Sequence, residues 1–148
     1  MNDAESTGLA ALRRIRDGVE PQIPLGELIG FRLTEAEPGW VAFELVAERE
    51  LLNSGGVLHG GVLSLVVDQA VGDAVRTLLP DGTPYMTTDL YVSYVRPAGV
   101  GATLRCTAEV TFLGGRTAKV SSRVYRGDEV VCECLTTLYV RRSAQKPR

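Results

Sequence analysis

The sequence predicts an α+β fold in which an antiparallel sheet of about five or six strands wraps around one long central helix. Three observations lead to this prediction. A glycine-rich turn at residues 53–61 runs into a long apolar segment with helical spacing. After that segment the apolar period changes from about 3.6 to about 2. Short turns that contain glycine or proline then separate the extended segments.

The part of the chain before the glycine-rich turn predicts two short helices, at residues 5–16 and 24–29. Apolar residues at helical spacing mark the first of them. A hairpin is expected next, with its strands at residues 31–36 and 40–46 and a Pro-Gly break between them.

The central helix is expected from about His59 to Leu79, where Pro80-Asp81-Gly82 ends it. Four long strands are expected after the helix, at residues 85–95, 102–112, 116–125 and 129–141. In the second of these strands apolar and polar residues alternate strictly, which predicts an inner and an outer sheet face.

Length and composition predict a single domain over residues 1–148, with a core at about 30–140 and a helical extension at 1–29. An apolar fraction of 45% and a charged fraction of 23% are typical of a soluble globular protein. The net charge of −2 argues against a general nucleic-acid binder. No run of residues approaches the ~18 apolar residues of a membrane span. We therefore expect neither nucleic acid nor a membrane as a partner.

The N-terminal residues have no basic region and no apolar core, so they do not predict a secretion signal. The three cysteines are Cys106, Cys132 and Cys134. Cys132 and Cys134 fall on one face of one expected strand, which is a poor arrangement for a disulfide. We therefore expect reduced thiols and a cytoplasmic protein.

The candidate active-site residues lie between Asn53 and Asp68. Gly60 and Gly61 fall where a helix begins, so their N–H groups lack a carbonyl four residues back and can stabilise an oxyanion. Asp68 follows among apolar residues, and burial of a carboxylate is costly unless it is paired. We predict a buried functional acid at Asp68, with Asp73 on another helix face as the weaker candidate. A structural acid, satisfied by a helix end or a partner subunit, is the alternative.

The order of elements, with this turn and helix, resembles the hotdog fold and, more narrowly, the acyl-CoA thioesterases of the phenylacetate-degradation type. The resemblance covers about residues 30–140. Its main motif is an asparagine, a His-Gly-Gly turn and an acid, matched here by Asn53, His59, Gly60, Gly61 and Asp68. Two shorter segments also match, Thr87-Thr88-Asp89 and Gly115-Arg116-Thr117.

The resemblance implies hydrolysis of an aryl- or medium-chain acyl-CoA to the free acid and coenzyme A. Asp68 would act as a general base toward water or as a nucleophile that forms a mixed anhydride. Gly60 would hold the oxyanion through its N–H, and Asn53 would hydrogen-bond the attacking water or the thioester carbonyl. Thr87 would assist near the attacking water, and His59 would brace the turn.

Substrate contacts are expected at two further places. Asp89 is expected to share a strand face with Thr87 and to line the pantetheine channel or pair with an arginine. By the resemblance, the turn at Gly114-Gly115-Arg116 touches the nucleotide end of coenzyme A, where bare backbone donors and a guanidinium suit phosphate. A plain hairpin followed by a solvated arginine is the alternative. The remaining expected substrate contacts are Gly61 and Thr117.

No metal or redox cofactor is expected, because the single histidine cannot form a zinc site with two cysteines on a distant strand. Coenzyme A enters as part of the substrate. Gly60 and Asp68 are separated by ~12 Å along one helix axis, yet both must act near one carbon. A two-fold homodimer with shared active sites is therefore predicted, and the resemblance implies pairs of such dimers.

Two other functions stay open, a hotdog hydratase or dehydratase and a non-catalytic acyl-CoA binder. A hydratase motif pairs its Asp with a nearby His, whereas here the His precedes Gly-Gly and Asp68 comes much later, which favours hydrolysis. The presence of both Asn53 and Asp68 argues against an inactive site.

Overall fold

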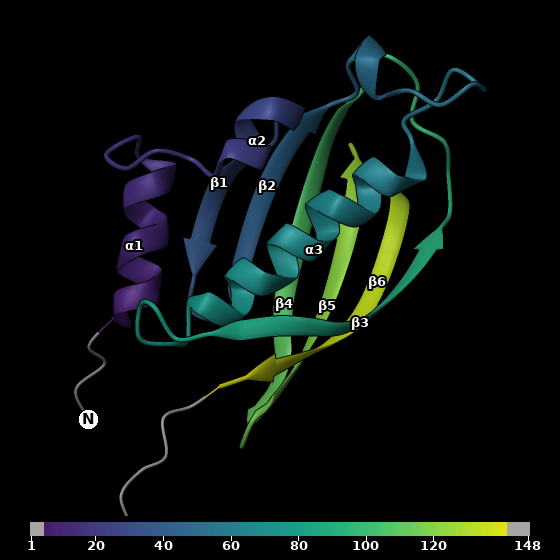
Figure 1. Ribbon diagram of the computed structural model, residues 1–148. Helices are drawn as coiled ribbons and strands as arrows, with labels where there is room; N and C mark the ends of the chain where they lie inside the picture. Colours follow the sequence, from purple (N-terminus) through teal and green to yellow (C-terminus); the bar gives the residue numbers. More distant parts are fainter. Residues whose placement is uncertain (1–4, 142–148) are drawn as a thin grey trace, which may run out of the picture.

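The computed structural model describes residues 5–141, so the outer ends of the expected 1–148 domain lie outside the described residues. One antiparallel sheet with the strand order β1-β2-β4-β5-β6-β3 curls around the helix α3 (Gly60–Arg76), as Figure 1 shows. This arrangement confirms the predicted α+β fold. The six strands are β1 (Arg32–Glu37), β2 (Trp40–Val46), β3 (Tyr85–Tyr94), β4 (Thr103–Gly114), β5 (Thr117–Arg126) and β6 (Glu129–Val140).

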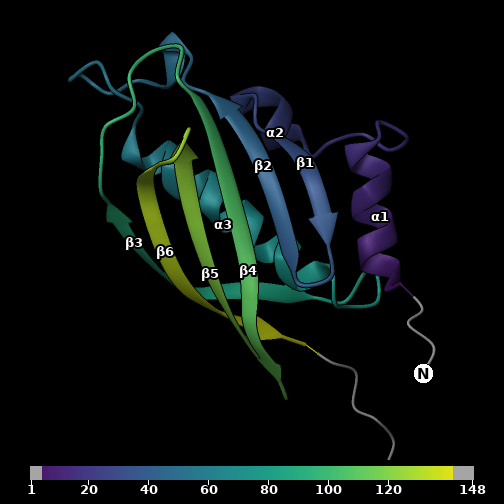
Figure 2. The ribbon, with the colours of Figure 1, turned by 180° about the vertical axis from the view of Figure 1, so that it is seen from behind.

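The core lies between α3 and the concave face of the sheet. Val67 and Val71 of α3 are fully buried there, together with Leu104 and Cys106 of β4. The outward residues of β4, such as Arg105, are exposed, so the predicted alternation of that strand is confirmed. Figure 2 shows the convex face of the sheet, which no helix of residues 5–141 covers. Burial of the apolar face of α3 therefore sets how the helix sits in the sheet.

The helix α3 ends at Arg76, earlier than the predicted Leu79. The next residue, Thr77, is buried and ties the helix end to the β1–β2 turn. Its Oγ1 accepts a hydrogen bond from the Gly39 N–H at 2.7 Å and donates to the Ala74 carbonyl at 2.6 Å. The backbone then tightens into bonds between residues three apart, as is common where a helix ends.

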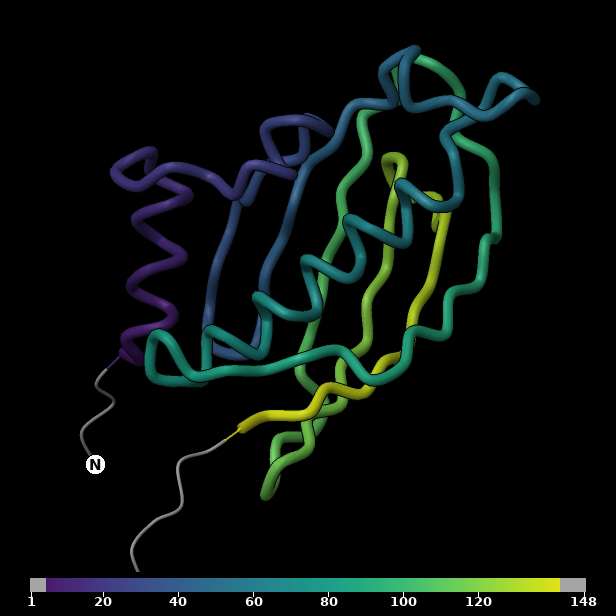
Figure 3. Tube along the Cα trace, viewed as in Figure 1, coloured from purple at the N-terminus to yellow at the C-terminus, as the bar shows by residue number. Residues whose placement is uncertain are grey.

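The two edges of the sheet differ. The helix α1 (Thr7–Arg16) packs beside β1, and Arg13 Nε donates to the Ala36 carbonyl at 3.1 Å. The short helix α2 (Pro24–Ile29) follows it, as predicted. At the other edge β3 pairs only with β6, so its second edge is unpaired within the described chain (Figures 1 and 3). An unpaired edge of this kind can pair with another chain.

The three cysteines are buried and form no disulfide. Burial raises the pKa of Cys106 and of Cys134 to about 12, and that of Cys132 to about 11. They are therefore protonated thiols at neutral pH. Within residues 5–141, no helix has the length and apolar character that crossing a bilayer requires.

Candidate active site

The turn that precedes α3 is braced by its histidine. His59 Nδ1 accepts a hydrogen bond from the Gly61 N–H at 2.9 Å, so the imidazole caps the first turn of the helix. The His59 carbonyl also accepts from the Val62 and Leu63 N–H groups. A Cβ at Gly61 would lie only 3.0 Å from His59 Nδ1. Glycine at this position therefore leaves room for the capping ring.

Gly60 is the first residue of α3, and its N–H has no acceptor among residues 5–141. The positive end of the helix dipole lies at the same place. The Gly60 carbonyl accepts a hydrogen bond from the Tyr94 hydroxyl at 2.9 Å. A free N–H at a helix start, on a backbone held by neighbouring groups, is suited to bind a developing negative charge.

Asn53 lines the same hollow as Gly60. Its Oδ1 accepts hydrogen bonds from the Gly55 N–H at 2.9 Å and from the Val57 N–H at 3.3 Å, so this oxygen stabilises its own loop. Only its NH2 group remains to bind a ligand, and that group is a donor. A donor suits the thioester carbonyl better than the attacking water, whose lone pair must stay available.

Asn53, Gly60 and Tyr94 line an open hollow of about 360 Å³. The other lining residues are Val57, Leu58, Leu63, Val95, Arg96, Pro97 and Ala98. Sequence reasoning did not select Tyr94, because only its place at the end of a strand could have indicated it.

Asp68 is exposed in the single chain, so the prediction of a buried acid at this position is wrong there. It lies on the α3 face of Gly61 and Ser64, which is turned away from the core. Its Oδ1 accepts a hydrogen bond from Thr87 Oγ1 at 2.7 Å. The structure therefore brings Asp68 and Thr87 together, across α3 and β3, as one group.

The buried acid of α3 is Asp73, which is 5% exposed. Gln69 Nε2 donates to its Oδ2 at 2.8 Å. Burial raises the pKa of Asp73 to about 6, against smaller opposing effects of the Gln69 hydrogen bond and the Arg76 charge. Helical periodicity could have indicated this burial, since Asp73 falls on the face of the buried Val66 and Ala70.

Asp89 does not share a strand face with Thr87, so that prediction is wrong. A β-bulge between Thr87 and Asp89 shifts the register: Thr87 stands opposite the buried Leu138, and Asp89 opposite the outward Thr137. The Asp89 carboxylate accepts from the Thr137 N–H at 2.9 Å and from Thr88 Oγ1 at 3.3 Å. Its partners among residues 5–141 therefore include no arginine.

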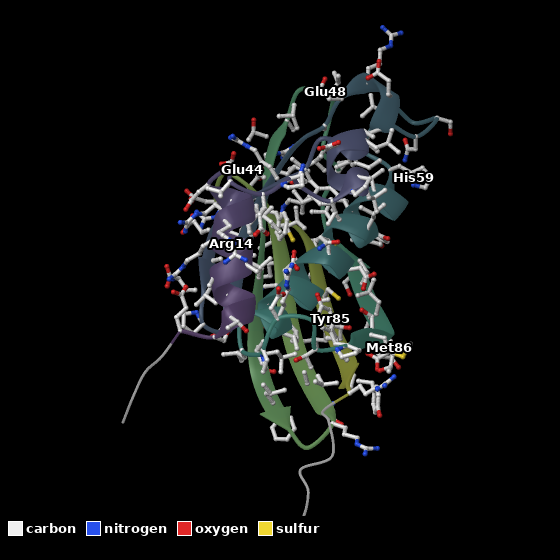
Figure 4. The ribbon with its side chains drawn as sticks, turned by 60° about the vertical axis from the view of Figure 1, so that its left-hand side comes forward. Arg14, Glu44, Glu48, His59, Tyr85 and Met86 are labelled. Atoms are coloured by element: carbon white, nitrogen blue, oxygen red, sulfur yellow. The ribbon has the colours of Figure 1, made fainter. Side chains whose placement is uncertain are left out.

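The β4–β5 turn carries the remaining predicted contacts, Gly114, Gly115, Arg116 and Thr117. Gly115 has a φ of 58°, which favours glycine, and the Arg116 side chain is exposed. Thr117 and Met86 both stand opposite Tyr139, so this turn lies at the end of the sheet where β3 begins. Figure 4 shows His59 at one end of α3, and Tyr85 and Met86 toward the other end.

The candidate residues thus form two groups within one chain. Asn53, Gly60 and Tyr94 lie near the start of α3. Asp68 lies about two turns further along α3, where it contacts Thr87 of β3. The helix between Gly60 and Asp68 is unbroken, so the two are separated by ~12 Å along its axis. Among residues 5–141, no three His, Cys, Asp or Glu side chains gather as a possible metal site.

Comparison with known proteins places these residues in a family. A family model described as the thioesterase superfamily matches residues 55–133. A Pseudomonas aeruginosa protein provisionally named an esterase is 30% identical over 125 residues, which cover 81% of this chain and 92% of that protein. Human acyl-coenzyme A thioesterase 13 is 33% identical over 78 residues, 53% of this chain and 55% of the human protein.

Solved structures show the same architecture. A phenylacetic acid degradation-related protein of Ralstonia eutropha superposes with a TM-score of 0.79 at 25% identity, covering 87% of this chain and 98% of that chain. The Escherichia coli PaaI protein from the phenylacetic acid degradation operon has a TM-score of 0.80 at 19% identity, over 93% of this chain and 97% of that chain, and shows the fold alone. The chain therefore belongs to the thioesterase superfamily and has the hotdog fold of that family.

Proposed function

We propose that the protein is an acyl-CoA thioesterase that hydrolyses an aryl- or medium-chain acyl-CoA to the free acid and coenzyme A. One observation carries the proposal: Gly60, whose N–H is unpaired among residues 5–141, lines the same hollow as Asn53, in a chain of the thioesterase superfamily. Two donor-bearing residues beside a helix start suit the carbonyl oxygen of a thioester. The buried thiols are the basis for proposing a cytoplasmic location as well.

In the proposed reaction the thioester oxygen lies against Gly60 N–H and the Asn53 NH2 group. These donors stabilise the charge that develops on the oxygen, and loss of one such donor typically costs about 10²–10³ in rate. Asp68 either takes a proton from water that attacks the carbonyl carbon, or attacks that carbon itself and forms a mixed anhydride that water cleaves. In both cases the C–S bond breaks and the departing sulfur takes up a proton.

Thr87 orients the Asp68 carboxylate in this scheme. It donates to Oδ1, whereas Oδ2 has no hydrogen-bond partner among residues 5–141 and is available to the water or the carbonyl carbon. A single turnover in oxygen-18 water tests the nucleophilic role. Label that enters the Asp68 carboxylate supports the nucleophile, whereas label only in the product is expected for the base and also for an anhydride that water cleaves at the acyl carbon.

We further propose that each site is shared by two chains of a homodimer, and that such dimers associate in pairs. The unpaired edge of β3 and the exposed Asp68 face of α3 support this proposal. A two-fold axis that sets the central helices antiparallel would bring Asp68 and Thr87 of one chain to Gly60 and Asn53 of the other. The Gly60 and Asp68 of one site then come from different chains, so the ~12 Å between them along one helix no longer separates them.

Complementation tests the shared site. Asn53→Ala and Asp68→Ala are expected to be inactive alone. After the two are unfolded and refolded together, each mixed dimer has one intact and one doubly altered site, so about a quarter of all sites should regain activity. Thiol release by the mixture measures this, and mass spectrometry confirms the heterodimers. An inactive mixture that contains heterodimers contradicts the shared site.

Arg116→Ala is expected to raise the KM for coenzyme A esters and to leave kcat nearly unchanged. The exposed guanidinium on the β4–β5 turn can pair with a phosphate, and the reacting carbon lies elsewhere. Short thioester analogues without the nucleotide should show no change in KM. Steady-state kinetics on both substrate types measure the effect. An equal change for both would mean that Arg116 does not contact the nucleotide.

A thiol-release assay across aryl- and alkyl-CoA esters tests the activity itself. Release of free coenzyme A with a matching amount of acid supports hydrolysis. Addition of water across an enoyl-CoA double bond, with no thiol released, would instead indicate a hydratase. Saturable binding of acyl-CoA without turnover would indicate the non-catalytic binder.

A further inference from the structure

Tyr94, the last residue of β3, lies over the first turn of α3. Its hydroxyl donates to the Gly60 carbonyl at 2.9 Å and lies 2.6 Å from Ser64 Oγ. Because one hydroxyl supplies one proton, Ser64 is the donor in the second bond. Ser64 therefore orients the Tyr94 hydroxyl toward Gly60.

The Tyr94 ring also explains why residue 60 is glycine. Gly60 is not among the glycines with a positive φ, so its backbone conformation would accept other residues. The surrounding space would not admit a side chain, since a Cβ at this position would lie 3.0 Å from Tyr94 Cζ and 3.1 Å from Tyr94 Cε1. Tyr94 thus contacts Gly60, whose N–H has no acceptor among residues 5–141, and both residues line the same hollow.

The peptide groups on both sides of Gly60 are held in place. On the N-terminal side, the His59 carbonyl accepts from the Val62 and Leu63 N–H groups. On the C-terminal side, the Gly60 carbonyl accepts from Tyr94 and the Gly61 N–H donates to His59. Tyr94 is the only one of these contacts that comes from the sheet. It therefore holds Gly60, and with it the first turn of α3, against the end of β3.

We propose that Tyr94 is a positioning residue for the proposed hydrolysis. It acts through Gly60, because its bond to the Gly60 carbonyl fixes the position of that residue, and so of its N–H, relative to β3. Ser64 acts through Tyr94. Such a donor stabilises a transition state only when its direction is fixed in advance, because reorientation during the reaction would cost part of the gain. The inference rests on the proposed thioesterase activity.

The test is a double-mutant cycle of Tyr94→Phe and Ser64→Ala. Tyr94→Phe keeps the ring over Gly60 and removes the hydroxyl, and we expect kcat to fall about tenfold while KM changes by less than about twofold. Ser64→Ala should lower kcat by a smaller factor. In the Tyr94→Phe background it should have no further effect, because the group through which it acts is gone.

Tyr91→Phe is the matched control. Tyr91 lies on the same strand, is 72% exposed, and its hydroxyl has no hydrogen-bond partner among residues 5–141. This variant should leave kcat unchanged. All four proteins should keep the urea midpoint and the oligomeric state of the wild type.

Four outcomes overturn the positioning role: a Tyr94→Phe kcat within about twofold of wild type, a midpoint that falls with kcat, additive effects of the two substitutions, or a raised KM at constant kcat. The last would mean that Tyr94 contacts the substrate directly. If the wild type hydrolyses no thioester, the proposed function fails separately. Amide hydrogen exchange at Val62 and Leu63, whose N–H groups are bonded in the first turn of α3, then decides about Tyr94, since Tyr94→Phe should speed it and Tyr91→Phe should not.

Discussion

Asp68→Asn is expected to remove most thioester hydrolysis while leaving the fold and substrate binding intact. The substitution is nearly isosteric, and Asp68 is exposed, so the core is not disturbed. Thr87 Oγ1 can still donate to the new side-chain oxygen, as it does to Asp68 Oδ1. What is lost is the carboxylate charge that acts as base or nucleophile, and general-base catalysis typically contributes about 10²–10⁴ in rate.

Steady-state thiol release measures the loss, and isothermal titration with the intact ester measures binding. Asp17→Asn, at the C-terminal end of α1 beside the opposite edge of the sheet, is the matched control and should keep full activity. Retention of more than about a tenth of the wild-type turnover by Asp68→Asn corresponds to a loss below ~1.4 kcal/mol. Asp68 would then not be the main catalytic group.

Asp73→Asn is expected to stabilise the protein at neutral pH. Burial raises the pKa of Asp73 from 3.8 to about 6, so the folded protein binds this proton more tightly than the unfolded chain does. The favourable contribution of neutral Asp73 is fully present below about pH 4 and is lost as the pH rises through about 6. A shift of about two units corresponds to about 3 kcal/mol, which is the upper limit of the gain from an uncharged asparagine.

The difference in unfolding free energy between Asp73→Asn and wild type should therefore be near zero at about pH 4 and reach its full value by about pH 7.5. Urea denaturation at equal protein concentration measures it at both pH values. Val71→Ala is the control, because Val71 is buried on the same helix and carries no titratable group. Its cost should be the same at both pH values. A difference for Asp73→Asn that does not grow with pH would contradict the prediction.

Most of the fold could be predicted from the sequence because its signals are local. The change of period after the central helix, together with the turns, indicated every α-helix and strand, and the bounds of α2 and β2 agree with the structure. The short 3₁₀ helix at Arg49–Leu51 was not predicted. The end of α3 was missed because Thr77 bonds to Gly39, which is distant in the chain. The bulge in β3 was missed because register is set by pairing with β6, and nothing within residues 85–94 indicates it.

For the candidate site, the sequence by itself determined the start of α3: the His59 cap, the Gly61 that leaves room for it and the free N–H of Gly60 all depend on neighbours in the chain. Only the tertiary structure decided that Asp68 is exposed beside Thr87, that Asp73 is the buried acid, and that Tyr94 lies over Gly60. The physical reason is the range of the interactions. Caps and turns satisfy hydrogen bonds within a few residues, whereas burial and contacts between α3 and β3 depend on which surfaces the folded sheet places against the helix.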